Sequence, residues 1–215
     1  MPSTRYQKIN AHHYRHIWVV GDIHGEYQLL QSRLHRLSFF PKIDLLISVG
    51  DNIDRGPESL DVLRLLNQPW FTSVKGNHEA MALEAFETGD GNMWLASGGD
   101  WFFDLNDSEQ QEAIDLLLKF HHLPHIIEIT NDNIKYAIAH ADYPGSEYLF
   151  GKEIAESELL WPVDRVQKSL NGELQQINGA DYFIFGHMMF DNIQTFANQI
   201  YIDTGSPNSG RLSFY

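Results

Sequence analysis

The chain has 215 residues, 43% of them apolar and 13% aromatic, which is enough to bury the core of one globular domain. Its 29 acidic and 15 basic residues give a formal net charge of −14, which opposes binding to nucleic acid or to an anionic membrane surface. Cysteine is absent, so disulfides and thiolate metal sites are excluded, and metal ligands must come from His, Asp, Glu and Asn.

Residues 1–15 are predicted to form a polar arm without an apolar stretch of signal-peptide length. No run of the sequence approaches the roughly 18 apolar residues of a membrane span. His12 and His13 lie in the arm, but no carboxylate is spaced to complete a metal site, so we interpret them as exposed or edge-strand side chains. We expect a cytoplasmic protein.

The first predicted strand, His16–Val20, ends in the glycine-flanked turn Gly21–Gly25. Asp22 and His24 in this turn flank one residue, so in an extended segment both side chains point the same way and can bind one ion. The leucine spacing over residues 29–37 predicts a helix next.

The second unit begins with the apolar run 43–49, which has the length and composition of a strand buried on both faces. The loop 50–57 follows and contains Asp51 and Asp54. These carboxylates are close enough to repel each other, so their placement favours a cation or a histidine that uses both. A helix is predicted over about residues 58–67.

The third unit repeats the arrangement. Residues 71–75 are predicted to be a short strand, the turn Gly76–Glu79 carries Asn77 and His78, and a helix is predicted over residues 80–87. Open α/β sheets bind ligands at the carboxyl ends of their strands, so three such turns in succession indicate one shared site.

Glycines interrupt the chain after residue 88, and we interpret residues 88–123 as a helical insertion whose main helix is capped by Asp107 or Ser108. Two uses are open for its aromatic side chains: they pack against the sheet, which is the commoner arrangement, or they line a substrate cleft. These side chains are Trp94, Trp101, Phe102 and Phe103.

Strand patterns return after Pro124. Residues 125–130 and 134–139 suit a hairpin that leads into His140, and residues 182–185 form a strand that ends just before His187. Short strands are predicted at 193–197, 199–203 and 211–215, whereas 143–178 is irregular and partly helical.

The polar residues that follow the strands make up the ligand inventory of a dinuclear hydrolytic site. We predict that Asp51 bridges two cations that lie about 3.5 to 4 Å apart. The alternative is a set of unrelated polar groups satisfied within the core. The six predicted ligands are Asp22, His24, Asp51, Asn77, His140 and His187.

Three segments resemble the signature motifs of the phosphoprotein phosphatase family of metallophosphoesterases: residues 21–25, 50–56 and 76–79. The subgroup of bacterial and phage serine/threonine protein phosphatases is the most similar, and the resemblance extends over nearly the whole chain. Further segments that carry it are residues 101–103, 138–143, 179–181 and 185–187.

The resemblance implies an α/β calcineurin-like metallophosphoesterase fold, with two mixed β-sheets that form a sandwich flanked by helices, as a single domain over residues 1–215. It also implies a metal-dependent phosphatase that hydrolyses phosphoserine or phosphothreonine in proteins, with phosphotyrosine as a further substrate. The cofactors are two divalent ions, manganese above iron or zinc. Asp22, His24 and Asp51 would hold one ion, and Asp51, Asn77, His140 and His187 the other.

In the implied mechanism, a hydroxide that bridges the ions attacks phosphorus directly, without a phosphoenzyme. Arg55 grips the phosphoryl oxygens, and His78, paired with Asp54, protonates the leaving oxygen. Relatives have a second phosphate-binding arginine where this chain has Val163, and we expect Arg165 to substitute for it. The chain also has Met188-Met189 where relatives have Thr-Pro after the histidine, which leaves His187 in place.

Two rival functions are considered. Symmetrical dinucleoside tetraphosphate hydrolases are similar across the three motifs, but they typically lack an aspartate at the position of Asp54 and have aspartate in place of Glu79. Both residues favour the protein phosphatase. A metal-bound, catalytically inactive docking module is disfavoured by the complete set of ligand and acid residues.

Overall fold

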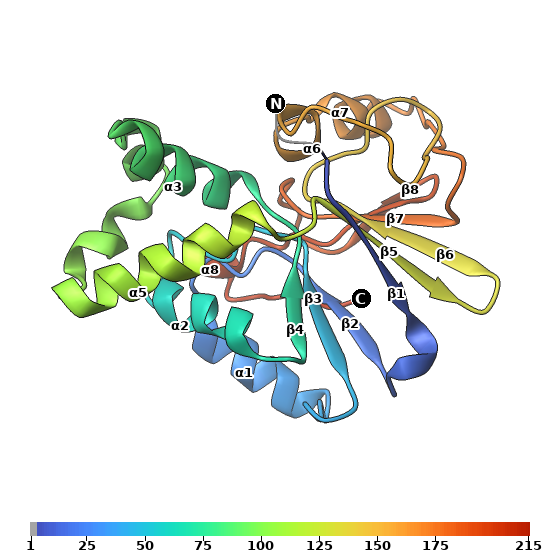
Figure 1. Cartoon of the computed structure of the whole chain (residues 1–215). Helices are drawn as coiled ribbons and strands as arrows, with labels where there is room; N and C mark the ends of the chain where they lie inside the picture. Colours follow the sequence, from blue (N-terminus) through green and yellow to red (C-terminus); the bar gives the residue numbers. More distant parts are fainter. Residues whose placement is uncertain (1–3) are drawn as a thin grey trace.

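The computed structural model describes residues 4–215, so the first three residues of the predicted polar arm lie outside it. Two β-sheets pack face to face between layers of helices (Figure 1). The larger sheet has the strand order β1-β5-β6-β7-β9-β8 and contains parallel and antiparallel pairs. Its strands are β1 (Tyr6–Asn10), β5 (Ile126–Asn131), β6 (Ile134–Ile138), β7 (Tyr182–Phe185), β8 (Gln194–Phe196) and β9 (Gln199–Tyr201).

The smaller sheet consists of three parallel strands, β2 (Ile17–Val20), β3 (Leu45–Ser48) and β4 (Phe71–Ser73). The carboxyl-terminal segment joins it beside β2 through an antiparallel bridge between Val20 and Phe214. The predicted strand at 211–215 is therefore reduced to a bridge. Val19 exchanges two backbone hydrogen bonds with Tyr215, and the Gly21 N–H donates to the Ser213 carbonyl, but within residues 4–215 no further backbone bond continues this ladder.

The prediction of a polar arm was wrong for residues 6–10, which form β1. All five residues of β1 pair in parallel with β5, from Tyr6 opposite Ile126 to Asn10 opposite Thr130. Apolar and polar residues hardly alternate along β1, because it is an edge strand in which only Ile9 is buried. The sequence pattern that marks a strand is therefore nearly missing. His12 and His13 lie in a short 3₁₀ helix, Ala11–His13, and are exposed.

The helices enclose the sheets on both outer faces. Figure 1 shows α1, α2, α3 and α5 on the side of the smaller sheet, and α6 and α7 beside the larger sheet. The α-helices are α1 (Tyr27–Arg36), α2 (Ser59–Arg64), α3 (Asn77–Thr88), α4 (Asn92–Ala96), α5 (Asp107–Leu117), α6 (Ser157–Leu160), α7 (Asp164–Leu170) and α8 (Ser206–Ser209). Further 3₁₀ helices are Leu65–Asn67, Gly99–Asp104 and Leu118–His121.

Two helix starts differ from the prediction. Helix α3 begins at Asn77 rather than at residue 80, because the Glu79 side chain accepts the backbone N–H of Gly76 and closes the first turn. Helix α5 is capped by Asn106, whose side chain accepts the N–H groups of Ser108 and Glu109. Asn77 and His78 consequently sit on a helical turn.

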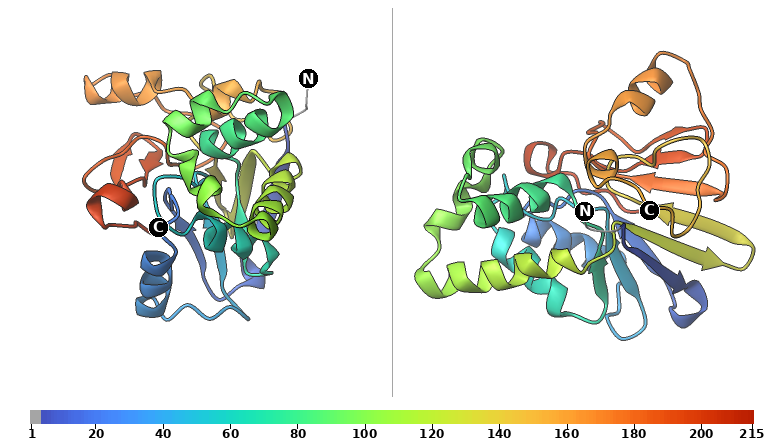
Figure 2. Two further views of the ribbon diagram at one scale, coloured as in Figure 1. Left: turned by 90° about the vertical axis from the view of Figure 1, so that its left-hand side faces the viewer. Right: turned by 45° about the horizontal axis from the view of Figure 1, so that its top comes forward.

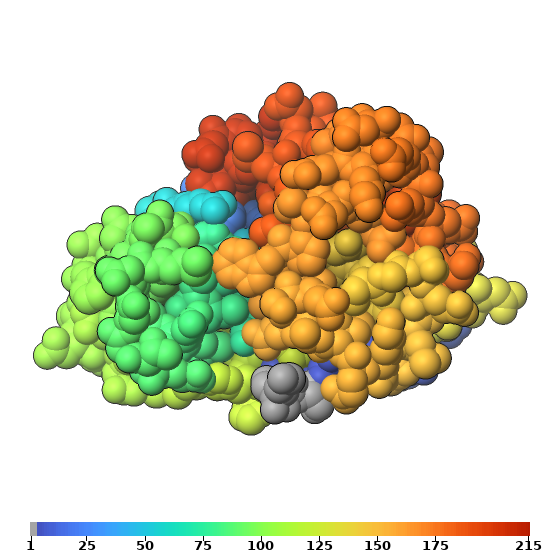
Figure 3. All heavy atoms as spheres, turned by 90° about the horizontal axis from the view of Figure 1, so that it is seen from above, coloured from blue at the N-terminus to red at the C-terminus, as the bar shows by residue number. Residues whose placement is uncertain are grey.

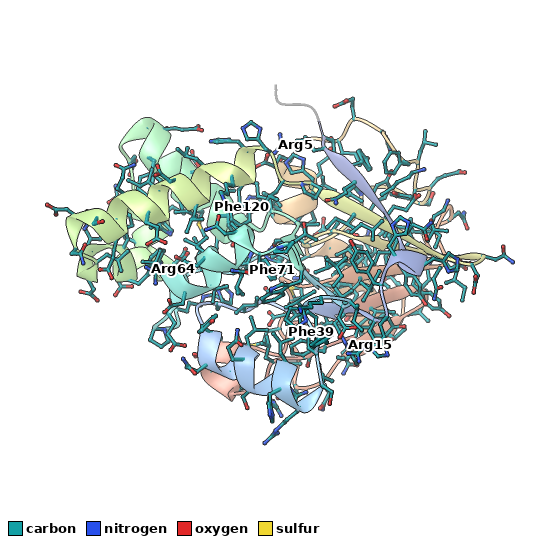
Figure 4. The ribbon with its side chains drawn as sticks, turned by 60° about the horizontal axis from the view of Figure 1, so that its bottom comes forward. Arg5, Arg15, Phe39, Arg64, Phe71 and Phe120 are labelled. Atoms are coloured by element: carbon teal, nitrogen blue, oxygen red, sulfur yellow. The ribbon has the colours of Figure 1, made fainter. Side chains whose placement is uncertain are left out.

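The apolar core is layered in the same way as the elements. Branched side chains such as Ile47 and Ile184 fill the space between the sheets. Figure 2 shows that the strands of the two sheets lie close together at one end and spread apart toward the other. Phe71 packs under α1 and α2, and Phe120 lies among α2, α3 and α5 (Figure 4). Arg64 of α2 joins these helices through hydrogen bonds of 2.9 and 2.8 Å to Glu112 of α5.

The strand directions bring six carboxyl ends to one edge. Strands β2, β3 and β4 run parallel to one another, and β6, β7 and β9 do so in the other sheet. Figure 3 views this edge from above, with the segment near residue 100 on one side and the segment near residue 160 on the other. Within residues 4–215, no helix has the length and apolar content needed to cross a bilayer.

Glu156 links the two sheets at this edge. Its carboxylate accepts from Lys75 Nζ, just beyond β4, at 2.8 Å and from His125 Nε2, just before β5, at 2.9 Å. Burial raises the pKa of Glu156, but the hydrogen bonds from His125 and Lys75 outweigh it and lower that pKa to about 2. The charged carboxylate is therefore the form that stabilises the fold.

We predict that Glu156→Gln lowers the free energy of unfolding by about 1 to 3 kcal/mol at pH 7. Because the pKa of Glu156 is lower in the folded state, the wild-type advantage is complete above about pH 4.5 and fades as the pH falls toward 2. Urea unfolding at several pH values measures the gap, with Glu158→Gln on the exposed side of α6 as control. A gap that stays constant down to pH 3 would contradict the assignment.

Candidate dinuclear metal centre

Five of the six predicted ligands follow different strands and meet at the shared edge. Asp51 is central: its Oδ1 lies 3.4 Å from His140 Nε2, and its Oδ2 lies 3.7 Å from His24 Nε2. Asn77 Oδ1 is 2.7 Å from His140 Nε2 and 3.0 Å from His187 Nδ1. The arrangement gives Asp51 one oxygen toward each group of histidines.

Asp22 lies at the same edge but makes a different contact. Its carboxylate accepts the backbone N–H of His187 at 3.1 and 3.2 Å. Two trios have ligand atoms within 4.8 Å of one another: Asp51, His140 and His187 in one, and Asp51, His24 and His78 in the other. Asp22 belongs to neither trio, and His78 takes its place in the second.

The ring nitrogens that face Asp51 carry lone pairs. His24 Nδ1 donates to the Ile53 carbonyl and His140 Nδ1 donates to the Val49 carbonyl, each at 2.8 Å, so the Nε2 atoms are assigned as unprotonated. His140 Nε2 then faces Asn77 Oδ1, which is also an acceptor. A cation bound to both atoms would satisfy the two acceptors, so the donor set fits metal ions.

Burial keeps these imidazoles neutral, which is the ligating form. It lowers the pKa of His24 to about 3 and that of His187 to about 4, and it also lowers the pKa of His140. Burial acts to raise the pKa of Asp51, but the nearby histidines His140, His78 and His24 outweigh it, so the pKa of Asp51 is lowered.

A third carboxylate, Asp203, was missed by the sequence analysis. It follows β9, whose direction matches that of β7, and it is buried near Asp22 and Asp51. Burial raises the pKa of Asp203 to about 6, and burial together with Asp203 and Asp51 raises the pKa of Asp22 well above its usual range. Crowded buried carboxylates of this kind favour bound cations. The signal was available, because Asp203 ends the mainly apolar segment that was predicted as the strand 199–203.

Backbone strain is concentrated at the site. Among the described residues, eight non-glycine positions have positive φ, and five of them are site residues. Such conformations cost about 1 to 3 kcal/mol each, and they persist where surrounding contacts fix them. The five are His24, Asp51, Asp54, Arg55 and His187.

Glu79 holds much of this strained backbone in place. Its two carboxylate oxygens accept the backbone N–H groups of Asp51 at 3.1 Å, Asn52 at 2.6 Å and Gly76 at 2.8 Å. Burial and the charge of Asp51 raise the pKa of Glu79 to about 7. Gly76 is required beside it, since a Cβ at that position would overlap the Asp51 side chain. Glu79 therefore joins the loop after β3 to the loop after β4.

His78, Asp54 and Arg55 form a second group that borders the first. His78 Nδ1 lies 2.6 Å from Asp54 Oδ2. Arg55 extends one guanidinium nitrogen to His78 Nε2 and another to His24 Nε2, each at 2.9 Å. Burial lowers the pKa of His78, but the carboxylates of Asp51 and Asp54 outweigh it and raise that pKa above its ordinary value.

Trp94 and Trp101 of the predicted insertion also reach Asp54. Trp94 Nε1 donates to the two carboxylate oxygens at 2.9 and 3.1 Å, and Trp101 Nε1 donates to Oδ1 at 2.7 Å. Trp94 is 2% exposed and packs edge-on against Phe86. The commoner interpretation of the sequence placed this ring against the sheet, whereas it packs among side chains of the helices. Its hydrogen bonds to Asp54 were not predicted.

Arg165 contacts protein atoms rather than the cation-binding groups. Its Nε donates to Asp142 Oδ1 at 2.8 Å, and its Nη2 donates to the carbonyl groups of both Tyr143 at 2.9 Å and Gly145 at 2.6 Å. The side chain is 8% exposed. These bonds support a role in holding the loop after His140, and the expected phosphate contact of Arg165 finds no support in them.

Comparisons with known proteins agree with the geometry. The sequence profile of the calcineurin-like phosphoesterase family matches residues 15–190. The chain is 59% identical to Serine/threonine-protein phosphatase 2 of Salmonella typhimurium, over 100% of this chain and 99% of that protein. It is 44% identical to Serine/threonine-protein phosphatase 1 of the same organism, over 99% and 96% of the two chains.

The chain is also similar to tetraphosphatases, either over part of its sequence or in its fold. A symmetrical bis(5′-nucleosyl)-tetraphosphatase of Dechloromonas aromatica is 34% identical over 58% of this chain and 42% of that protein. A crystal structure titled as a candidate diadenosine tetraphosphatase superimposes with a TM-score of 0.73 over 98% of this chain and 92% of that chain. At 24% identity, this likeness shows the fold alone.

We predict that Glu79→Ala lowers the free energy of unfolding by about 3 kcal/mol or more, because it leaves three buried N–H groups without an acceptor. Glu79→Gln keeps one acceptor oxygen and should fall between this variant and the wild type. Urea unfolding measures the loss, with Glu84→Ala on the exposed side of the same helix as control. Equal midpoints for Glu79→Ala and Glu84→Ala would overturn the scaffold role.

Proposed function

The chain belongs to the calcineurin-like phosphoesterase family, and from this premise we propose that it is a metal-dependent protein phosphatase that hydrolyses phosphoserine and phosphothreonine monoesters. The observation that carries the proposal is the full-length similarity to two serine/threonine protein phosphatases. The clustered donor set at the shared strand ends supports it independently.

Two divalent cations are the proposed cofactors. Asp22, His24 and Asp51 would hold one, and Asp51, Asn77, His140 and His187 the other. When bound, the cations would neutralise phosphate charge and make a water nucleophilic near neutral pH. Oxygen and imidazole donors without thiolates suit manganese, with iron and zinc as alternatives, because such donors discriminate weakly among these metals.

The remaining residues of the site handle the phosphate and the proton. Arg55 is exposed at the edge of the site and offers a planar guanidinium for the phosphoryl oxygens. His78 holds its Nδ1 against Asp54 and turns Nε2 toward the Arg55 guanidinium, so a phosphate held by Arg55 would bring its leaving oxygen near the Nε2 proton. The Asp54 carboxylate stabilises the imidazolium form required for that transfer.

Asp54 and Glu79 also favour this function over cleavage of dinucleoside tetraphosphates. Asp54 holds His78 in the orientation of a proton donor for a poor leaving group, and serine and threonine alkoxides are such groups. A polyphosphate leaves as a stabilised anion and needs this help less. An inactive docking module would not require His78, Asp54 and Arg55 in contact.

The substrates are proposed to be phosphoproteins, and the acidic chain argues against nucleic acid as a partner. We propose that residues 1–215 act as one catalytic domain, of which about residues 88–123 form the helical insertion. A cytoplasmic location stays a prediction from the sequence.

Turnover of peptides tests the function. With manganese, the protein should release phosphate from phosphoserine and phosphothreonine peptides, and a chelator should abolish the activity because the ions neutralise the phosphate. His78→Asn should lower kcat on the phosphoserine peptide by about 10²- to 10⁴-fold, and His122→Asn, at an exposed position, should not. Faster cleavage of diadenosine tetraphosphate than of either peptide would contradict the proposal.

Metal titration tests the ligand assignment. In calorimetry with manganese, the wild type should bind two ions and His140→Ala one, because His140 contacts only the proposed second set. His13→Ala, at an exposed histidine, is the control and should keep two. An unchanged stoichiometry for His140→Ala would remove this histidine from the metal site.

A further inference from the structure

Asp54 is the carboxylate of the group that it forms with His78 and Arg55. Its side chain is fully buried, and three ring N–H groups converge on it from His78, Trp94 and Trp101. Oδ2 faces His78 at 2.6 Å, whereas Oδ1 receives both indoles. Trp101 therefore holds the oxygen that points away from the histidine, and Trp94 donates to both oxygens.

The two indole bonds compensate a buried negative charge. A carboxylate taken out of water without donors is strongly destabilised, and charge-assisted bonds of 2.7 to 2.9 Å are among the strongest that side chains form. They also fix the plane of the carboxylate, since Trp101 holds one oxygen, His78 holds the other and Trp94 donates to both. A rotated Asp54 would leave at least one of these N–H groups unpaired.

The segment 94–101, which carries both tryptophans, also supports the backbone of the site. The Gly98 carbonyl accepts the Arg55 N–H at 3.2 Å, and the ring of Trp94 packs so close to Gly99 that a Cβ there would lie 2.6 Å from it. Asp54 and Arg55 both have positive φ, so the loop that carries them is braced by the segment from Trp94 to Trp101. The predicted insertion is thus part of the catalytic framework.

We propose that Trp94 and Trp101 are positioning residues for proton donation: their indole N–H groups fix the Asp54 carboxylate, which orients His78 toward the leaving oxygen. This inference rests on the proposed function, in which His78 is the proton donor. In that reaction a water oxygen forms the new P–O bond and releases a proton to solvent. The ester P–O bond breaks with its electron pair on the leaving oxygen, and that oxygen takes the proton of His78 Nε2.

The leaving group separates this role from general support of the fold. Phenyl phosphate has a poor leaving group that needs the proton, whereas p-nitrophenolate leaves as a stable anion and does not. A defect in proton donation therefore slows phenyl phosphate selectively. Lost folding or lost metal slows both esters equally.

The test compares kcat for the two aryl phosphates in the manganese-loaded full chain. Trp101→Phe, at a partly buried position, should lower kcat on phenyl phosphate by about 5- to 50-fold, with KM unchanged and less than about threefold loss on p-nitrophenyl phosphate. Trp70→Phe, in the separate aromatic group with Phe39 and Phe71, is the matched control and should change neither. Trp94→Phe should act as Trp101→Phe does, and if this buried variant fails to fold, Trp101→Phe alone decides.

A double-mutant cycle makes the test specific. If the tryptophans act through Asp54, the double variant Asp54→Asn/Trp101→Phe should have the same ratio of kcat on phenyl phosphate to kcat on p-nitrophenyl phosphate as Asp54→Asn alone. Equal losses on both esters, no loss on either, or a further independent loss in the double variant would overturn the proposal. A wild type that cleaves both aryl esters but no phosphoserine peptide would contradict the proposed substrate and leave this ratio decisive.

Discussion

The structure depends on the concentration of negative charge and lone pairs around Asp51. Its two oxygens face different histidines, and the carboxylates of Asp22 and Asp203 are buried close by. Without cations such an arrangement is costly, because buried like charges repel and acceptors face acceptors. The fold maintains it by joining two sheets whose strand ends meet at one edge.

Hydrogen bonds from the surrounding elements hold these residues in place despite this cost. Glu79 ties two loops together through backbone N–H groups, which allows Asp51 to keep a positive φ. The tryptophans of the insertion do the same for Asp54. Each strained residue at the site is therefore held by hydrogen bonds from a neighbouring element, which is the arrangement expected where strain serves binding or catalysis.

Much of this site could be predicted from the sequence, since its residues follow apolar strands in short glycine-led turns. Asp22, Asp51, Asn77 and His187 are each marked by such a local pattern. Contacts between distant segments were harder to predict. Nothing local indicates that Trp101 donates to Asp54, 47 residues earlier, or that the Arg165 guanidinium is bound by Asp142.

The strands of the fold were likewise predictable where a local pattern marks them and not where a distant segment decides their pairing. Strands with strong apolar runs, such as β3 and β7, were predicted within two residues of their observed bounds, because burial on both faces leaves a clear pattern. The edge strand β1 was missed and the carboxyl-terminal strand was overpredicted, since their pairing is decided by the neighbouring strand rather than by their own residues.

Anomalous scattering from crystals grown with manganese addresses the central claim most directly. Two peaks about 3.5 to 4 Å apart should lie on either side of the Asp51 carboxylate, one toward His24 and the other toward His140. A single peak, or peaks that lie away from Asp51, would contradict a bridging role for this residue and with it the proposed hydrolytic centre.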